Sequence, residues 1–200
     1  SPSGSGIEPL PKTAQADRMA AASTRRARRL ICLVGFMGCG KTTVGRRLAQ
    51  RLGWYFVDLD AEIVRLAGTS ITRIFQEKGE PAFRDLEHEA LRRVLGRAQE
   101  AEQPLILALG GGTIVQERNL QLVRAAEATL IWLDCPVEEL LKRCAGVTDR
   151  PLFRDEDSFR KLYAQRLPYY QQADYRVDST ATQDEVVERI VALDLMAPVR

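Results

Sequence analysis

Residues 30–42 read L-I-C-L-V-G-F-M-G-C-G-K-T, and this stretch decides the fold. The apolar run Leu30–Val34 predicts a buried strand, and an amphipathic helical pattern follows, with Val44 and Leu48 on its apolar side. Between strand and helix, Gly35–Thr42 matches G-x-x-x-x-G-K-T, the pattern of a phosphate-binding loop. Strand, loop and helix in this order are the context that the pattern requires. We therefore predict that the loop binds a nucleoside triphosphate.

The residue types in the loop suit that task. Glycines let the backbone wrap around phosphate oxygens with its N–H groups pointing inward, and the N-terminus of the following helix adds favourable partial charge. Lys41 is placed to reach the β- and γ-phosphates, and the Thr42 hydroxyl to coordinate Mg²⁺. A glycine-rich turn with a surface lysine is the plainer alternative, and the flanking strand and helix count against it. The expected nucleotide contacts in the loop are Gly38, Cys39, Gly40, Lys41, Thr42 and Thr43.

Size and charge narrow the class of protein. The chain has 200 residues, enough for one domain with a sizeable core. Its net charge of +2 is too small to indicate nucleic-acid binding. No apolar stretch approaches the roughly 20 residues that a membrane-spanning helix needs. We expect neither a nucleic acid nor a membrane as partner.

The four cysteines show no C-x-x-C pairing and no partner histidines at zinc spacing. Cys32 and Cys135 lie in or beside apolar strands, which favours buried thiols, whereas Cys39 lies inside the loop as a candidate for a reactive thiol. A reduced, cytoplasmic setting is expected. The only histidine, His88, is expected to be solvated or to cap a helix.

Residues 1–29 differ in kind from the rest. They are rich in Ser, Gly, Pro, Ala and Arg and have almost no large apolar residues, so they cannot bury a core. The opening S-P-S-G-S-G resembles an expression remnant or a linker, and an organelle transit peptide is a further alternative. We expect a disordered, basic, functionally silent tail before a domain that spans residues 30–196.

Short apolar strands alternate with amphipathic helices after the loop. Runs of this kind, buried on both faces and separated by helices, predict an α/β fold with a five-stranded parallel sheet flanked by helices. The carboxyl ends of all the strands then meet at one edge. Further strands are expected at 54–58, 105–109, 129–133 and 175–177, and helices near 60–67, 71–77, 81–99, 116–126, 136–144, 157–172 and 182–195.

Two carboxylates leave the second strand at that edge, in the D-x-D pair Asp58 and Asp60. They are placed to organise Mg²⁺ or to accept a proton from an attacking hydroxyl. The plainer alternative is that Asp60 caps the helix that follows. The spacing does not separate the two readings, and the neighbouring phosphate loop favours function.

An arginine at the start of a helix and a run of three glycines after a strand are further candidates for the site. Arg84 follows Pro81 in the first turn of a helix, an unfavourable place for a cation, which suggests a nearby anion; a solvated helix surface is the open alternative. Gly110–Gly112 follow a strand and leave the backbone open to close approach by a ligand, or else form a plain turn.

A long polar loop runs from about 145 to 157. Such a loop is uncommon in a compact domain unless it works as a lid, and this one would place Arg150 over the phosphates. Arg166 projects from the following helix in R-L-P-Y-Y. Either arginine alone would be interpreted as surface charge.

Taken together, in their order along the chain, these motifs point to one protein family. The ordered set G-F-M-G-C-G-K-T, F-V-D-L-D, G-E-P-A-F-R, L-G-G-G, D-R-P-L and R-L-P-Y-Y resembles the shikimate kinases and covers nearly all of residues 30–195. Gluconate kinases share the phosphate loop but lack the D-x-D, E-x-x-F-R and G-G-G combination. The resemblance implies the P-loop kinase fold with a mobile lid at about 145–157.

The resemblance implies a role for each position at the acceptor end. Asp60 matches the aspartate that orients, and helps to deprotonate, the 3-hydroxyl of shikimate. Arg84 and Arg166 correspond to the two arginines that hold its carboxylate, a partner that suits a planar guanidinium fork. Gly111 and Gly112 align with backbone that contacts the substrate.

At the nucleotide end, Asp58 matches the aspartate that acts on Mg²⁺ through water, alongside Thr42. Arg150 resembles the lid arginine on the ATP phosphates. Arg143 and Gln183 occupy positions of the adenine site. The family often has a proline near residues 182–184, which this chain lacks, so the adenine contacts stay open.

The implied reaction transfers the γ-phosphoryl group of ATP to shikimate, giving ADP and 3-phosphoshikimate for aromatic amino acid biosynthesis, with Mg²⁺ and with Lys41, Asp60 and Arg150 as catalytic residues. The family is commonly monomeric, so a monomer is expected. The alternatives are a kinase for another small hydroxy acid such as gluconate, and a non-catalytic nucleotide-binding module that regulates a partner. A GTPase switch is disfavoured because the chain has no N-K-x-D motif.

Overall fold

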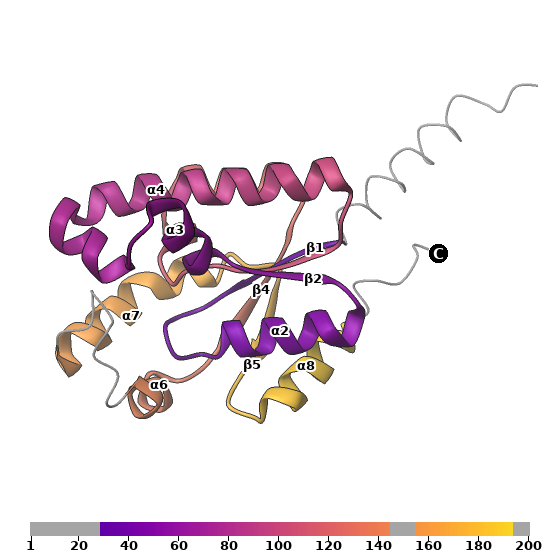
Figure 1. The fold of residues 1–200 in the computed structure, drawn as a ribbon. Helices are drawn as coiled ribbons and strands as arrows, with labels where there is room; N and C mark the ends of the chain where they lie inside the picture. The colour runs from indigo at the N-terminus through magenta and orange to yellow at the C-terminus, as the bar shows by residue number, and fades with distance from the viewer. Residues whose placement is uncertain (1–28, 145–154, 194–200) are drawn as a thin grey trace, which may run out of the picture.

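The computed structural model describes residues 29–144 and 155–193 (Figure 1). The five strands in this part of the chain form one parallel sheet in the order β2-β3-β1-β4-β5. The predicted fold class is therefore confirmed. The expectations about residues 1–28, about Arg150 and about most of the lid fall outside the described residues. The strands are β1 Leu30–Val34, β2 Tyr55–Asp58, β3 Leu105–Ala108, β4 Thr129–Asp134 and β5 Tyr175–Asp178.

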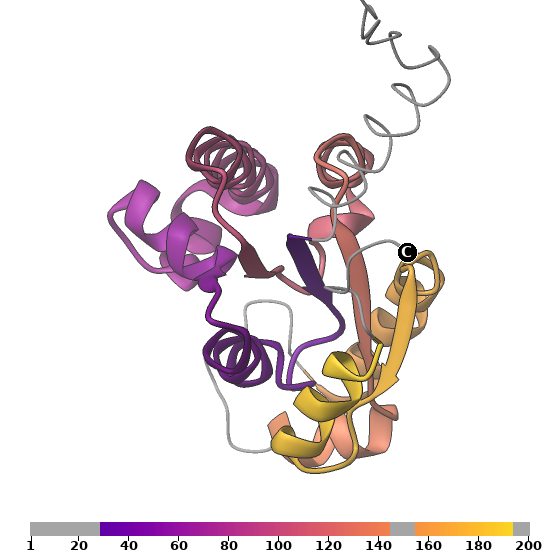
Figure 2. The same cartoon turned by 90° about the vertical axis from the view of Figure 1, so that its right-hand side faces the viewer.

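Helices cover both faces of the sheet (Figures 1 and 2). α2 and α8 pack together on one face, and the long α4 lies with α5 on the other. The central strands β1 and β3 are buried along their whole length, as a sheet covered on both faces requires. The helices are α2 Lys41–Leu52, α3 Leu59–Ala67, α4 Ile71–Ala101, α5 Glu117–Ala125, α6 Val137–Cys144, α7 Glu156–Tyr170 and α8 Gln183–Val191, with a 3₁₀ turn η1 at Thr113–Val115.

α2 follows the predicted division of its faces. Val44 and Leu48 are buried, while Arg47 and Arg51 are exposed and pair with Asp184 and Glu188 of α8. The helix ends at Gly53, whose left-handed backbone lets its N–H close the last turn. This packing fixes the direction in which the N-terminus of α2 points, toward the carboxyl edge of the sheet.

α4 contains the break that the sequence places between 71–77 and 81–99. Gly79 has φ 81° and ψ 173°, a conformation open to glycine and strained for other residues, and Pro81 follows it. The two predicted helices therefore run into each other across a kink instead of being separated by a loop. The kink gives the second segment its own first turn, in which Arg84 lies.

The cysteine expectations hold in part. All four cysteines are free and buried, which confirms the buried thiols at Cys32 and Cys135. Burial raises the pKa of Cys32 to about 12 and that of Cys135 to about 11. Cys39 is also buried, so the structure does not favour it as a reactive thiol. Among the described residues, none of the helices is both long enough and apolar enough to cross a membrane.

Candidate active site

A cavity of about 360 Å³ opens at the carboxyl edge of the sheet. It joins segments that are far apart in sequence: the phosphate loop, the ends of β2 and β3, the kinked part of α4, and single arginines from α6 and α7. The sequence-predicted site residues that line it are Gly38, Gly40, Lys41, Thr42, Thr43, Asp58, Asp60, Arg84, Gly111, Gly112, Arg143 and Arg166.

The phosphate loop has the geometry that its glycines predict. Gly38 and Gly40 have φ of 83° and 93°, and Gly40 is the residue before α2. The Lys41 ammonium donates to the carbonyls of Gly35 at 2.6 Å and Phe36 at 3.1 Å. The loop is therefore closed around its own lysine, with the N-terminus of α2 facing the cavity.

Thr42 and Asp58 meet across the cavity floor. The Thr42 hydroxyl donates to Oδ2 of Asp58 at 2.9 Å, while Oδ1 of Asp58 accepts from the backbone N–H of Asp60 and so caps α3. A hydroxyl and a carboxylate are the oxygen ligands that Mg²⁺ takes, usually with phosphate oxygens and water for the rest. The described residues hold no cluster of three His, Cys, Asp or Glu that could bind a metal alone. The site thus fits Mg²⁺ bound together with nucleotide phosphates.

Asp60 does not cap the helix, so the plainer interpretation of this residue is wrong. α3 begins at Leu59 and its cap is Asp58, which leaves the Asp60 side chain in the first turn. The Asp60 carboxylate borders the cavity, and Oδ1 lies 3.1 Å from where a Cβ on Gly110 would be. It is thereby placed between the phosphate loop and the glycine turn after β3.

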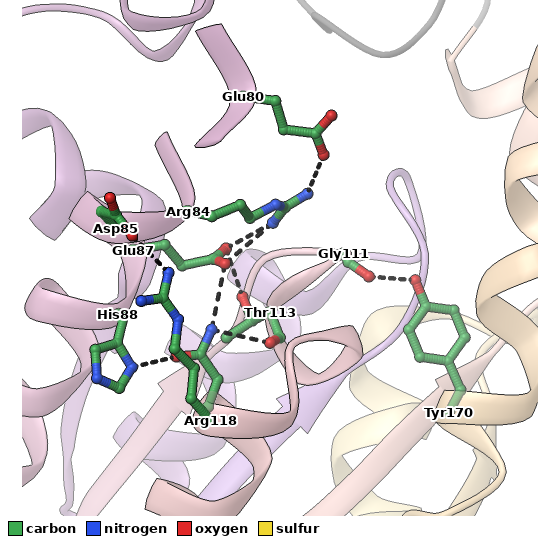
Figure 3. Close-up of polar contacts among 10 residues, drawn as sticks. Glu80, Arg84, Asp85, Glu87, His88, Gly111, Thr113, Arg118 and Tyr170 are labelled. Atoms are coloured by element: carbon green, nitrogen blue, oxygen red, sulfur yellow. Dashed lines mark hydrogen bonds and ion pairs between the residues drawn. The ribbon is translucent and has the colours of Figure 1, made fainter. Parts of the chain in front are cut away.

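Arg84 is part of a buried ion pair that sequence reasoning missed (Figure 3). Its Nη1 donates to both oxygens of Glu87, at 3.0 and 3.1 Å, and Nη2 reaches Glu80 at 3.4 Å. Arg84 is 8% exposed and Glu87 fully buried. The Nε of Arg84 has no hydrogen-bond partner among the described residues. The only signal in the sequence was a glutamate three residues after Arg84, at a spacing that also occurs on solvated helix surfaces.

A second layer of hydrogen bonds holds Glu87 in place (Figure 3). The Thr113 hydroxyl donates to Oε2 at 3.0 Å, and Nδ2 of Asn119 lies 3.4 Å from Oε1 and 3.0 Å from the Thr113 carbonyl. Nδ1 of His88 lies 2.8 Å from Oδ1 of Asn119. Because that amide oxygen can only accept, the histidine nitrogen donates. His88, which is half-buried in the interior of α4, is therefore tied to Asn119 and does not cap a helix, contrary to that part of the expectation.

Arg166 approaches the same point from α7. It is 6% exposed, and its guanidinium lies over the ring of Phe36 at 5.6 Å. Burial lowers the pKa of Arg166, and the nearby charge of Arg84 acts in the same direction. Two buried guanidinium groups therefore lie close together, and the carboxylate of Glu87 offsets the charge of one of them.

The guanidinium groups of Arg84 and Arg166 both lie beside the glycine turn at residues 110–112. A Cβ on Gly112 would lie 2.6 Å from Nη2 of Arg84 and 3.0 Å from Nη2 of Arg166. A Cβ on Gly111 would lie 2.9 Å from Nη1 of Arg166. The turn is therefore glycine because any side chain would occupy space next to the guanidinium groups, and it is more than a plain turn.

The expected adenine residues lie beside the phosphate loop. Arg143 donates to the carbonyls of Gly38 at 3.4 Å and Ser179 at 3.0 Å. A neighbouring cavity of about 520 Å³ is lined by Arg143, Gln183 and Cys39, among others. Arg143 borders both cavities, so the structure brings these residues next to the loop.

Comparison with known proteins agrees with this geometry. The family model described as shikimate kinase matches residues 37–194. The chain belongs to the shikimate kinase family. Shikimate kinase of Persephonella marina is 42% identical over 152 residues, covering 76% of this chain and 89% of the relative, and that of Geobacter metallireducens is 41% identical over 167 residues, covering 82% and 88%.

Solved structures agree. The shikimate kinase from Acinetobacter baumannii in complex with shikimate superposes with a TM-score of 0.77 at 36% identity, over 85% of this chain and 94% of that one. A gluconokinase from Sinorhizobium meliloti, at 17% identity and a TM-score of 0.54 over 82% and 89% of the two chains, shares the fold alone. Shikimate kinases transfer a phosphoryl group from ATP to shikimate with Mg²⁺, and this is the reaction of the chain. The gluconate alternative is not favoured.

Proposed function

We propose that Arg84 and Arg166 bind the carboxylate of shikimate and that the phosphate loop binds ATP at the other end of the same cavity. The observation that carries this assignment is the approach of both guanidinium groups to Gly112, in a cavity that Lys41 and Thr42 also line. Guanidinium forks match a carboxylate in geometry as well as in charge. An acceptor without a carboxylate would leave the buried Arg166 guanidinium without an anion and Arg84 with only Glu87 and Glu80, which gives the site its specificity.

Asp60 orients the 3-hydroxyl of shikimate and accepts its proton as the phosphoryl group transfers. Its position between the loop and Gly110 supports this role. Phosphoryl transfer demands alignment and charge stabilisation more than covalent chemistry. The backbone N–H groups of Gly111 and Gly112 add donors beside the acceptor.

At the nucleotide end, Lys41 and the amides of the loop bind the phosphates, and Thr42 with Asp58 holds Mg²⁺. The metal ion neutralises charge on the phosphates when it is bound. Arg143 and Gln183 contact the adenine, supported by the cavity that they share. For Arg150 and a lid at about 145–157 the support is the sequence motif.

The remaining assignments concern the whole chain. We place the catalytic domain at residues 30–196 behind a tail at 1–29, and expect a monomer that takes small-molecule substrates. Free thiols in the described residues support a reducing, cytoplasmic setting.

ADP release tests the proposal directly. Rapid ADP release from Mg·ATP with shikimate, and little release with gluconate or without an acceptor, is the expected result. Equal release with gluconate would remove the carboxylate-binding specificity assigned to Arg84 and Arg166, since the site would then not distinguish acceptors. A chain that binds ATP without turnover would instead be a regulatory module.

A further inference from the structure

Tyr170 is a buried hydroxyl at the acceptor end for which the proposed reaction has no role. It ends α7 and is 1% exposed, and its ring packs on Trp132 with centroids 6.2 Å apart. The hydroxyl donates to the carbonyl of Gly111 at 2.6 Å (Figure 3). This contact ties the end of α7 to the glycine turn 59 residues earlier in the chain.

Arg166 lies one helical turn earlier on α7, beside the same glycine turn. A Cβ on Gly111 would lie 2.9 Å from Nη1 of Arg166 and 3.7 Å from the Tyr170 oxygen, so both groups border the same point of the glycine turn. A guanidinium can only donate, and the single O–H of the tyrosine already points at Gly111. The tyrosine O–H is therefore committed to the Gly111 carbonyl, and its oxygen remains an acceptor beside the Arg166 guanidinium.

The hydrogen bond from Tyr170 that fixes the Gly111 carbonyl also fixes the direction of the Gly112 N–H. The described residues contain no cis peptide, so the carbonyl of Gly111 and the N–H of Gly112 point in opposite directions from one rigid plane. The N–H of Gly112 donates to no acceptor within residues 29–144 and 155–193. It remains available to a ligand in the cavity that Gly112 lines.

We propose that the Tyr170 hydroxyl is a positioning group that sets the Arg166 guanidinium and the Gly112 amide in register for the acceptor carboxylate. This inference rests on the proposed function, in which that carboxylate binds between Arg84 and Arg166. Tyr170 does not touch the substrate. It acts through the two groups that do.

Tyr170→Phe removes the hydroxyl and keeps the ring against Trp132. We expect the KM for shikimate to rise roughly 3–10-fold, the scale of one hydrogen bond, with the KM for ATP within about twofold of wild type. The dissociation constant for shikimate, followed by tryptophan fluorescence without ATP, should rise by the same factor. An unchanged KM and dissociation constant would overturn the proposal.

Tyr163→Phe is the matched control. Tyr163 lies on the same helix and its hydroxyl donates to the Cys135 carbonyl at 3.4 Å, outside the residues that line the site cavity. A purely structural role for Tyr170 predicts that both variants lower the Tm and leave the shikimate KM unchanged. A shikimate KM raised equally in both variants would also contradict the positioning role.

A double variant tests whether the hydroxyl works through Arg166. In an Arg166→Ala background, Tyr170→Phe should raise the KM by a smaller factor than in the wild type, because one of the two groups that the hydroxyl orients is gone. Equal factors in both backgrounds would sink the proposal. Arg84→Ala, which leaves Tyr170 untouched, separates the two ideas: a normal shikimate KM there would refute the proposed function itself.

Discussion

The carboxylate of Glu87 lies 3.0 Å from Nη1 of Arg84 and is fully buried. The positive charge of Arg84 is therefore compensated by a carboxylate of the protein itself. Arg84→Ala would remove a substrate contact and also leave a buried carboxylate without its partner. We expect the shikimate KM to rise roughly 10–100-fold, and the free energy of unfolding to fall by about 3–5 kcal/mol. Steady-state kinetics and chemical denaturation measure the two effects.

Arg84→Lys separates these effects. Lysine keeps a cation near Glu87 but loses the planar fork, so the loss of stability should be much smaller than in Arg84→Ala while the shikimate KM still rises roughly tenfold. A lysine variant with a normal KM would show that Arg84 serves only to neutralise Glu87. The KM for ATP should stay near the wild-type value in both variants.

Asp58→Asn tests the metal end of the site. Asparagine caps helices about as well as aspartate, so the cap of α3 should survive and the Tm should change little. The loss of charge should raise the Mg²⁺ concentration needed for half-maximal activity by roughly 10–100-fold. An unaltered Mg²⁺ requirement would exclude Asp58 from the metal site.

Asp60→Asn probes proton transfer. The amide has nearly the same shape as the carboxylate and the backbone N–H that donates to Asp58 is retained, so the fold should persist. Turnover should fall by roughly 10²–10⁴-fold, the usual scale for loss of a general base, with a smaller change in the shikimate dissociation constant. Turnover near the wild-type value would leave Asp60 with no part in proton transfer.

Gly112→Ala should weaken shikimate binding without harming the fold. Its backbone, at φ −107°, suits any residue, but the added methyl would lie 2.6 Å from Arg84 and 3.0 Å from Arg166 and would displace both side chains. We expect a shikimate KM raised roughly tenfold or more. Gly96→Ala in α4 is the control: the methyl meets nothing within 4 Å, so it should stabilise the protein by about 0.4–1 kcal/mol at unchanged activity.

Local patterns determine the phosphate loop, the alternation of strands and helices along the chain, and the positions of the D-x-D and G-G-G motifs. These features could therefore be predicted from the sequence. Leu30–Val34 is apolar at every position, and the glycines of the loop admit few other structures. The strand limits shifted by a residue at Trp54, Leu109, Asp134 and Asp178, because ladder hydrogen bonds, not hydropathy, decide where a strand ends.

Contacts between distant segments could not be predicted in this way. Glu87 looks like an exposed helix residue until α4 packs on α5 and supplies Asn119, 32 residues later. His88 has the same partner, so its hydrogen bond depends on the same packing. The hydrogen bond from Tyr170 to Gly111 spans 59 residues, and neither the helical pattern around Tyr170 nor the glycine run around Gly111 indicates it. The family resemblance pointed to the substrate-binding arginines but not to the groups that hold them.

The kink at Gly79 makes the chain sensitive to substitution at a position where an added side chain would meet little. A Cβ on Gly79 would meet only Pro81, at an ordinary contact distance of 3.8 Å, so the space around this residue would admit a larger side chain. The left-handed backbone makes every other amino acid unfavourable, and the strain would pass down the helix to Arg84, five residues on. Tolerance to mutation at this position is therefore governed by torsion angles rather than by neighbours, and a substitution far from the nucleotide would register as poor affinity for the acid.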